Sequence, residues 1–295
     1  MVKRSILILT FLMVTLCCGN QKESVTPDDT KTPIFFVHGH GMSAGSFNTL
    51  IAYLQQESNY PASYLRTIQL VPDDGSNIEA AENQIAPAVE DFLEEINEFI
   101  QEEGLGIPLK TKVNIISHSM GGLSSRWYVA KVRPDRVHKW ISLAGANHGT
   151  DVLCRWSGEG ADDMCPANAE NEEQSLIQYQ LNGDPPGSEN EADVDETPYG
   201  LGTDLEGVNV IEPTEGQKVL YVTIRTSNDS WIDPDESVIL DGAGGVEIPI
   251  PGDLPATITS DGNILMQNDV GHDEMLEDKD VMRLIKIILE LRLDG

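Results

Sequence analysis

The chain has 295 residues, of which 40% are hydrophobic, and this is enough to bury one substantial core. Its formal net charge is −30 at pH 7. Proteins hold a nucleic-acid backbone through clustered lysine and arginine side chains, which so acidic a chain lacks, and we therefore expect no nucleic-acid partner. High negative charge also keeps a protein soluble, and this is the simpler explanation of the value.

The first eighteen residues have the layout of an export signal. Two basic residues precede an apolar run from Ile6 to Leu16, which is too short to span a membrane. The run ends in a Leu-Cys-Cys sequence that resembles a bacterial lipoprotein signal, so we predict lipidation at Cys18 over simple cleavage nearby. Residues 1–18 are thus the predicted signal and residues 19–32 a flexible tether. The predicted location is outside the cell or lipid-anchored at the bacterial cell envelope.

Apolar strands alternate with amphipathic helices through the remainder, residues 33–295, which we expect to form the folded domain. This alternation predicts an α/β fold with a mostly parallel central sheet flanked by helices. The expected strands are 34–37, 64–71, 112–116, 138–143, 218–226 and 263–267. The expected helices are 44–56, 76–104 with a kink or restart at Pro87, 123–132 and 278–293.

The turn after the strand at 112–116 has the residue pattern of a nucleophile elbow. It reads Ser117-His-Ser-Met-Gly121 and leads directly into helix-forming sequence. In such a turn the serine hydroxyl stands exposed above the sheet, and small residues are needed two positions before and two after it. Ser117 and Gly121 meet that requirement, although the consensus has glycine at the first position. Ser119 is therefore the predicted nucleophile.

The sequence His38-Gly-His-Gly41 follows the first expected strand and is a candidate oxyanion loop. Its glycines let the backbone approach a developing oxyanion closely. We predict two donors, the N–H groups of His40 and of Met120, the second at the positive end of the helix that follows Ser119. The imidazoles of His38 and His40 are expected to pack or hydrogen-bond locally.

Three blocks of sequence carry a family resemblance. Residues 33–39 (PIFFVHG), 117–122 (SHSMGG) and 143–150 (LAGANHGT), in this order, look like the secreted bacterial class 2 lipases of the α/β-hydrolase superfamily. The resemblance runs from about Pro33 to the C-terminus and is loose between the blocks. It implies an α/β-hydrolase fold, ester or lipid substrates, a Ser–His–Asp triad in the chain order Ser, Asp, His, and no organic cofactor.

Asp229 and His272 are the predicted partners of the serine. Asp229 stands just beyond the strand at 218–226, where ligand-facing residues of a parallel sheet collect, and His272 lies on a loop after the last strand. His272 would take the serine proton and Asp229 would orient the imidazole. Asp233 and Asp235 lie close by as alternative acids, but Asp233 directly precedes a proline, which favours a position further from the strand end. The agreements that favour His272 are absent for the other histidines, among them His118, His138 and His148.

Residues 151–216 have no regular periodicity and form a predicted lid-like insertion. No basic residue occurs between Arg155 and Lys218. Cys154 and Cys165 are an even pair that would reach an oxidising compartment, which predicts a disulfide at the base of this insertion. A short helix is expected within 173–182. A solvated acidic surface explains the carboxylates more simply than a calcium site does, and we predict no bound metal.

Two other functions remain open at this point. A polyester depolymerase or an amidase on the same fold has the same triad, because the shape of the pocket decides between such substrates. A surface lipoprotein that uses a hydrolase fold only for binding would have a broken triad, whereas all three expected members are present in this chain.

Overall fold

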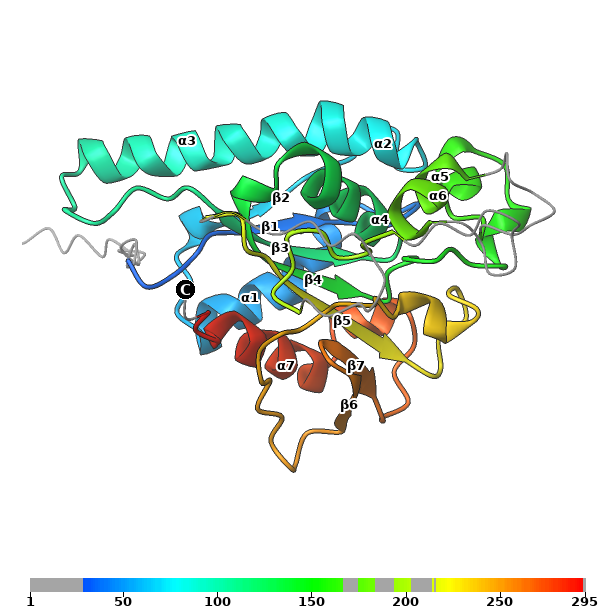
Figure 1. Ribbon diagram of the computed structural model, residues 1–295. Coiled ribbons are helices and arrows are strands. Elements are labelled where there is room, and N and C mark those ends of the chain that lie inside the picture. Colours follow the sequence, from blue (N-terminus) through cyan, green and yellow to red (C-terminus); the bar gives the residue numbers. More distant parts are fainter. Residues whose placement is uncertain (1–28, 167–174, 184–193, 203–213, 215, 294–295) are drawn as a thin grey trace, which may run out of the picture.

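The computed structural model describes residues 29–166, 175–183, 194–202, 214 and 216–293. The predicted export signal with Cys18, and residues 19–28 of the predicted tether, lie outside this described part. Within it the strands form one seven-stranded sheet in the order β2-β1-β3-β4-β5-β7-β6 (Figure 1). Neighbouring strands are parallel except β6 and β7, which are antiparallel. The strands are β1 Ile34–Val37, β2 Leu65–Thr67, β3 Val113–His118, β4 Val137–Leu143, β5 Leu220–Thr226, β6 Ala256–Ser260 and β7 Asn263–Met266.

Helices cover both faces of the sheet. Helices α2, α3 and α4 lie on one face, and α1 and α7 lie on the other (Figure 1). Helices α5 and α6 lie at the end of the sheet toward which β4 and β5 point. No helix of the described segments is long and apolar enough to cross a membrane. The helices are α1 Asn48–Glu57, α2 Asn77–Glu79, α3 Ala86–Glu102, α4 Met120–Trp127, α5 Glu159–Asp163, α6 Leu176–Asn182 and α7 Lys279–Glu290.

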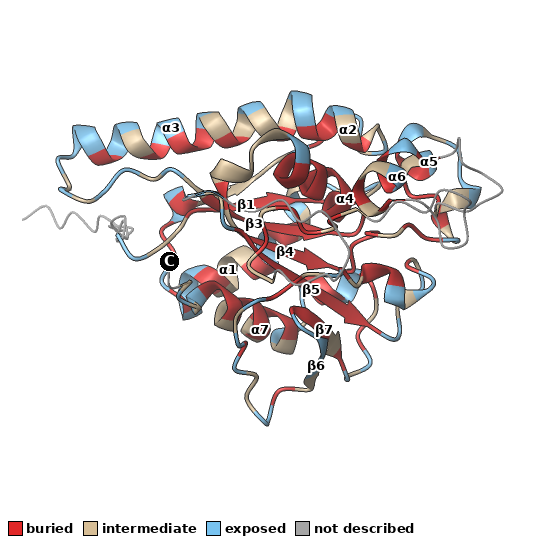
Figure 2. Ribbon diagram, in the orientation of Figure 1, coloured by how far each residue is buried: buried red, intermediate tan, exposed pale blue. Residues whose placement is uncertain are grey.

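The core lies between the sheet and these helices, as the burial colours of Figure 2 show. Every residue of β1, β3 and β5 is buried, because helices cover both faces of the central strands. The apolar and β-branched residues that dominate these strands are what made them predictable. The expected α/β fold with a mostly parallel sheet is confirmed.

The long helical segment from α2 to α3 changes from π-helical to α-helical hydrogen bonding just before Pro87, without a break in the helical backbone. The side chain of Ser76 accepts a hydrogen bond from the Glu79 N–H at the start of α2. A π-helical turn, Ala80–Ile85, then leads into α3, and Pro87 is the second residue of α3. The apolar stripe of α3 packs on the sheet.

A buried lysine joins the sheet to the last helix. Lys139 of β4 donates hydrogen bonds to the carbonyl oxygens of Ile288, Leu289 and Leu291 at 3.0, 2.7 and 2.7 Å. These carbonyls lie at the C-terminal end of α7, and that of Ile288 also accepts the N–H of Leu291 at 3.3 Å. A positive charge suits the negative end of the helix dipole. Lys139 therefore fixes the position of α7 under the sheet.

One strand was predicted too long and another was not predicted, and both lie at the edges of the sheet. The strand expected over 64–71 is only Leu65–Thr67, because the chain then leaves the sheet and the Leu70 N–H binds the imidazole of His38. Strand β6 was not predicted, since four of its five residues are exposed and their polar composition does not indicate a buried strand. The Asp261-Gly262 pair before β7 could have indicated the β6–β7 hairpin, because Asp-Gly commonly forms the turn between hairpin strands.

Candidate active site

The backbone at Ser119 has the strained geometry of a nucleophile elbow. Ser119 lies between β3 and α4 and has a φ of 55°. Residues other than glycine rarely adopt a positive φ. A Cβ on Gly121 would lie 2.5 Å from the carbonyl oxygens of Val37 and His38, so only glycine fits there. A Cβ on Gly39 would lie 2.6 Å from the Cβ of Ser119. The loop after β1 is therefore packed tightly against the turn at Ser119.

Asp229 and His272 form a buried pair. The Nδ1 of His272 lies 2.8 Å from the Oδ2 of Asp229, and both side chains are almost fully buried. The other carboxylate oxygen, Oδ1, accepts the N–H groups of Trp231 and Ile232 at 2.8 and 2.9 Å. Because three donors surround this carboxylate, its orientation is fixed and it holds the proton of His272 on Nδ1.

The two alternative acids lie apart from His272. Asp233 is exposed, and its backbone carbonyl accepts the N–H of Asp151 at 3.0 Å. Asp235 pairs with Arg225 of β5. Of the three acids considered from the sequence, only Asp229 contacts the histidine.

Ser119 and His272 line one cavity of about 280 Å³. The Ser119 hydroxyl makes no hydrogen bond to any described residue, which leaves it open to a ligand in the cavity. The N–H groups of His40 and Met120, the two predicted oxyanion donors, likewise lack an acceptor in the described part of the chain. The cavity is lined by His40, Gly41, Met42, Ser119, Leu153, Trp156, Trp231, His272 and Asp273.

Two tryptophans that the sequence analysis did not single out form an aromatic wall of this cavity. The ring of Trp156 contacts His40 edge-on at a centroid distance of 6.2 Å, and contacts Trp231 in the same way at 5.7 Å. Cys154, two residues before Trp156, forms a disulfide with Cys165. The first part of the insertion is thus cross-linked beside the cavity. The predicted short helix in this insertion is present as α6.

The block at 143–150 holds the loop that carries Asp229 and Trp231. The hydroxyl of Thr150 donates to the carbonyl oxygen of Trp231 at 2.6 Å and accepts the N–H of Asp233 at 3.2 Å. Ser237 donates to the carbonyl oxygen of Gly149 at 2.7 Å. This block contributes no side chain to the cavity lining, and its place near the site is explained by these contacts.

The imidazole of His38, in the candidate oxyanion loop, has local hydrogen-bond partners. The Nε2 of His38 accepts the N–H of Leu70 at 3.0 Å, so its proton is on Nδ1, which donates to the carbonyl oxygen of Gly39 at 2.9 Å. Burial lowers the pKa of His38 and favours this neutral form. His38 thus shapes the loop that holds the His40 N–H.

Of the described residues, one group of three side chains lies close enough to hold a metal ion, namely His118, His272 and Asp273. Two imidazoles do not suit calcium, which prefers oxygen ligands.

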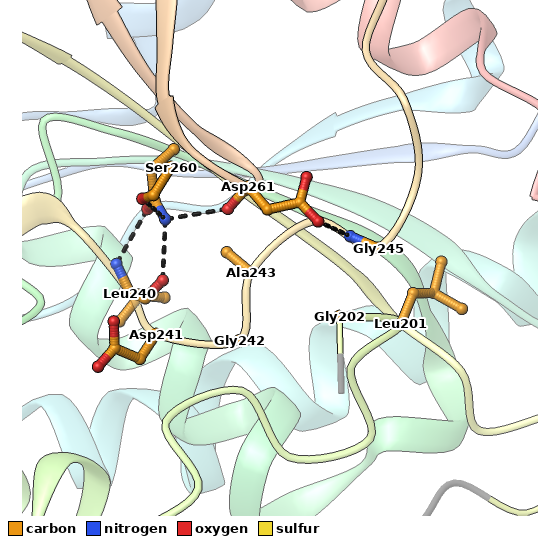
Figure 3. A pocket seen from close by; sticks show the side chains of 10 residues that line it. Leu201, Gly202, Leu240, Asp241, Gly242, Ala243, Gly245, Ser260 and Asp261 are labelled. Carbon is orange, nitrogen blue, oxygen red and sulfur yellow. Dashed lines mark hydrogen bonds between the residues drawn. The ribbon is translucent and has the colours of Figure 1, made fainter. Parts of the chain in front are cut away.

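A second cavity, of about 440 Å³, lies beside the β6–β7 hairpin (Figure 3). Its lining includes Leu240 to Ala243, Ser260 and Asp261. The amide of Asn263 donates to the carbonyl oxygens of Leu240 and Asp261 and to the Ser260 hydroxyl, and the Asp261 carboxylate accepts the Gly245 N–H. These polar groups hydrogen-bond to one another, and the lining of this cavity contains no histidine or cysteine.

Comparisons with known proteins agree with this architecture. The mature form of a lipase from Bacillus licheniformis superposes with a TM-score of 0.52 at 16% identity, over 90% of this chain and 95% of the lipase. The propeptide form of that lipase gives a TM-score of 0.55 at 14% identity, over 92% of this chain and 52% of the other. A protein from Listeria innocua gives 0.50 at 10% identity, over 90% and 96% of the two chains. Identities this low show a shared fold only.

Sequence comparison is more specific than the structural likeness. None of the curated proteins matches the chain. Residues 33–183, just over half of the chain, match the family model described as palmitoyl protein thioesterase. The matched region includes β1, the turn at Ser119 and α6. The chain therefore belongs to the palmitoyl protein thioesterase family, and it is a hydrolase of the α/β-hydrolase fold.

Proposed function

We propose that this protein hydrolyses carboxylic esters through a catalytic triad of Ser119, His272 and Asp229. The observation that carries the proposal is the joint placement of two features at one cavity. Ser119 stands on a strained elbow with a hydroxyl that no described residue binds, and His272, which lines the same cavity, has its Nδ1 fixed by a buried carboxylate. A serine, a histidine and an orienting acid in this relation activate a hydroxyl for attack.

Each step of the reaction uses one of these groups. The Nε2 of His272 removes the proton from the Ser119 hydroxyl as its oxygen bonds to the ester carbonyl carbon. The N–H groups of His40 and Met120 stabilise the oxyanion, at roughly 3 kcal/mol per donor. The protonated Nε2 then gives its proton to the departing alkoxide, and the acyl group stays on Ser119. Water then attacks the acyl carbon as Nε2 takes its proton. The bond from this carbon to the Ser119 oxygen breaks, and Nε2 returns the proton to that oxygen, which releases the carboxylic acid and restores the serine.

The cavity supports an ester or lipid substrate with an apolar acyl group. Its wall is made of indole rings, Leu153 and Met42, and its volume of about 280 Å³ is near the lower end for small-molecule sites. A thioester is the second candidate substrate, because the matching family is described as a thioesterase family. A thiolate leaves more readily than an alkoxide, so the same three residues would suffice. An amide or a polyester would use them as well.

The test is hydrolysis of matched substrates by the wild-type protein and by Ser119→Ala. An ester, a thioester and an amide of the same acyl group separate the candidate activities, and an ester series of increasing chain length gives the acyl preference. Ser117→Ala is the matched control, because the Ser117 hydroxyl is buried against the Ile141 carbonyl oxygen and is not part of the cavity lining.

We expect wild type and Ser117→Ala to turn over the ester and Ser119→Ala to lose turnover with an unchanged fold. Turnover by Ser119→Ala within tenfold of wild type would reject the assigned nucleophile. No turnover of any substrate by the wild-type protein would instead favour a surface protein that uses this fold for binding.

We also propose that the chain is exported and carries lipid on Cys18. The motivation is the signal-like layout of residues 1–18. Mass spectrometry of the protein made in a bacterial host should find a lipidated N-terminal cysteine, and Cys18→Ala should remove the lipid. Cys17→Ala is the matched control and should keep it. A mature protein that begins at Gly19 or later would exclude the lipidated form.

A further inference from the structure

His118 is a fully buried titratable group beside the proposed site, and the triad mechanism does not use it. It ends β3 directly before Ser119 and has no exposed surface. Its Nε2 lies 3.0 Å from the main-chain carbonyl oxygen of His272. A carbonyl oxygen only accepts, so Nε2 carries the proton, and Nδ1 faces the thioether sulfur of Met42 at 3.2 Å. The rings of His118 and His272 lie 4.5 Å apart between centroids.

Three contacts hold the segment that carries His272. The hydroxyl of Thr226, at the end of β5, donates to the carbonyl oxygen of Val270 at 2.8 Å. Asp229 fixes the imidazole through Nδ1. His118 binds the backbone carbonyl of His272, and it does so from the residue next to Ser119. It therefore links the positions of the two reacting groups directly.

We propose that His118 is a positioning residue, whose Nε2–H donates to the His272 carbonyl and so sets the distance between the His272 imidazole and the Ser119 hydroxyl. This inference rests on the proposed function of Ser119 and His272. A shift of about 1 Å between reacting groups can cost about a hundredfold in rate, so a fixed backbone at His272 matters for turnover.

The charge state of His118 suits this role. Burial lowers the pKa of His118 to about 3, and the positive charge that His272 acquires in the reaction acts in the same direction. Asp229 is the carboxylate that acts on His118 in the opposite sense, more weakly than burial. His118 thus stays neutral around neutral pH and does not repel the imidazolium that forms 4.5 Å away.

The experiment compares His118→Phe with His118→Gln. Phenylalanine fills a similar volume and has no donor, whereas the glutamine amide can place an N–H close to the position of Nε2. We expect His118→Phe to lower kcat by about 10- to 100-fold with an unchanged KM, and His118→Gln to restore most of the loss. A packing role alone predicts that Phe keeps the activity. Wild-type kcat in His118→Phe, or equal losses in both variants, would overturn the proposal.

A second measurement does not depend on activity or on the folding of His118→Phe. Nitrogen NMR of the wild-type protein, with the signals of His118 identified by their loss in His118→Gln, reports which ring nitrogen carries the proton. We expect a neutral ring protonated on Nε2 from pH 5 to pH 9. A proton on Nδ1, or titration within that range, would refute the inferred hydrogen bond. If Ser119→Ala kept its activity instead, the proposed function would fail while this hydrogen bond could still stand.

Discussion

Replacement of Asp229 by asparagine tests the proposed site most sharply. The Oδ1 of Asp229 accepts two N–H donors, from Trp231 and Ile232 at 2.8 and 2.9 Å. In Asp229→Asn the carbonyl oxygen must keep this place, because an amide NH₂ would face two donors there. The NH₂ group then faces the Nδ1 of His272, which must accept. The proton of the imidazole moves to Nε2, and this nitrogen can no longer take the proton of Ser119.

The expected loss of turnover is large because Asp229→Asn places the His272 proton on the wrong ring nitrogen, whereas the packing of the site stays the same. In serine proteases the same exchange lowers turnover by about four orders of magnitude, which corresponds to roughly 5 kcal/mol in the activation barrier. The measurement is kcat for a short-chain ester near neutral pH. Urea unfolding of both proteins should show that the variant, whose side chain has nearly the same shape, keeps its fold.

Asp233→Asn is the matched control. The Asp233 side chain is exposed, and its carboxylate makes no hydrogen bond to any described residue, so we expect activity close to that of wild type. Turnover by Asp229→Asn within tenfold of wild type would refute the tautomer argument. Inactivity of Asp233→Asn with an active Asp229→Asn would show that the wrong acid was assigned.

Three further predictions concern the aromatic wall of the cavity, the disulfide between Cys154 and Cys165, and the stability of the protein in acid. Trp156 is half-exposed at the cavity, so Trp156→Ala should raise kcat/KM for long-chain esters relative to short ones several-fold, and an unchanged ratio would exclude Trp156 as a determinant of chain length. The disulfide joins residues 11 positions apart, so Cys154→Ser with Cys165→Ser should lower the free energy of unfolding by about 3 kcal/mol in urea titrations; no change would mean that the cross-link constrains little. Burial, and then the charges of Lys139 and Lys112, lower the pKa of His138 to about 4, so its stabilising contribution is complete above pH 6.5 and is lost as the pH falls toward 4. Between pH 7 and pH 5 the wild-type protein should therefore lose about 2 kcal/mol relative to His138→Gln, and parallel pH profiles would contradict the assignment.

The strands that the sequence predicts well are those buried on both faces. Ile34–Val37, Val113–His118 and Leu220–Thr226 are fully buried, and their apolar residues alone indicate a central parallel strand. The two edge strands were the difficult ones. Leu65–Thr67 is only partly buried, and Ala256–Ser260 is mostly exposed, so the composition of neither contains the signal of a core strand. Where an edge strand ends depends on partners elsewhere in the chain.

The candidate site also has a part that the sequence predicts and a part that it does not. Ser119, Asp229 and His272 were predicted from local motifs and from their order along the chain. The contact of His118 with the His272 carbonyl joins residues 154 positions apart, and no local pattern predicts it. The tryptophans of the cavity wall were missed for the same reason, because each is held by residues from distant segments. The sequence therefore indicates the candidate chemistry of the site better than the contacts that position it.

The departure of the elbow from its consensus has a steric explanation. The consensus asks for glycine on both sides of the nucleophile, but the two positions meet different surroundings. At Gly121 a Cβ would lie 2.5 Å from two carbonyl oxygens of the chain leaving β1, which cannot move without disturbing the loop that carries the His40 N–H. Ser117 is still part of β3, and its hydroxyl faces the carbonyl oxygen of Ile141 on the neighbouring strand at 3.4 Å. A side chain is therefore accommodated at position 117 and excluded at position 121, where the carbonyl oxygens of Val37 and His38 leave no room for a Cβ.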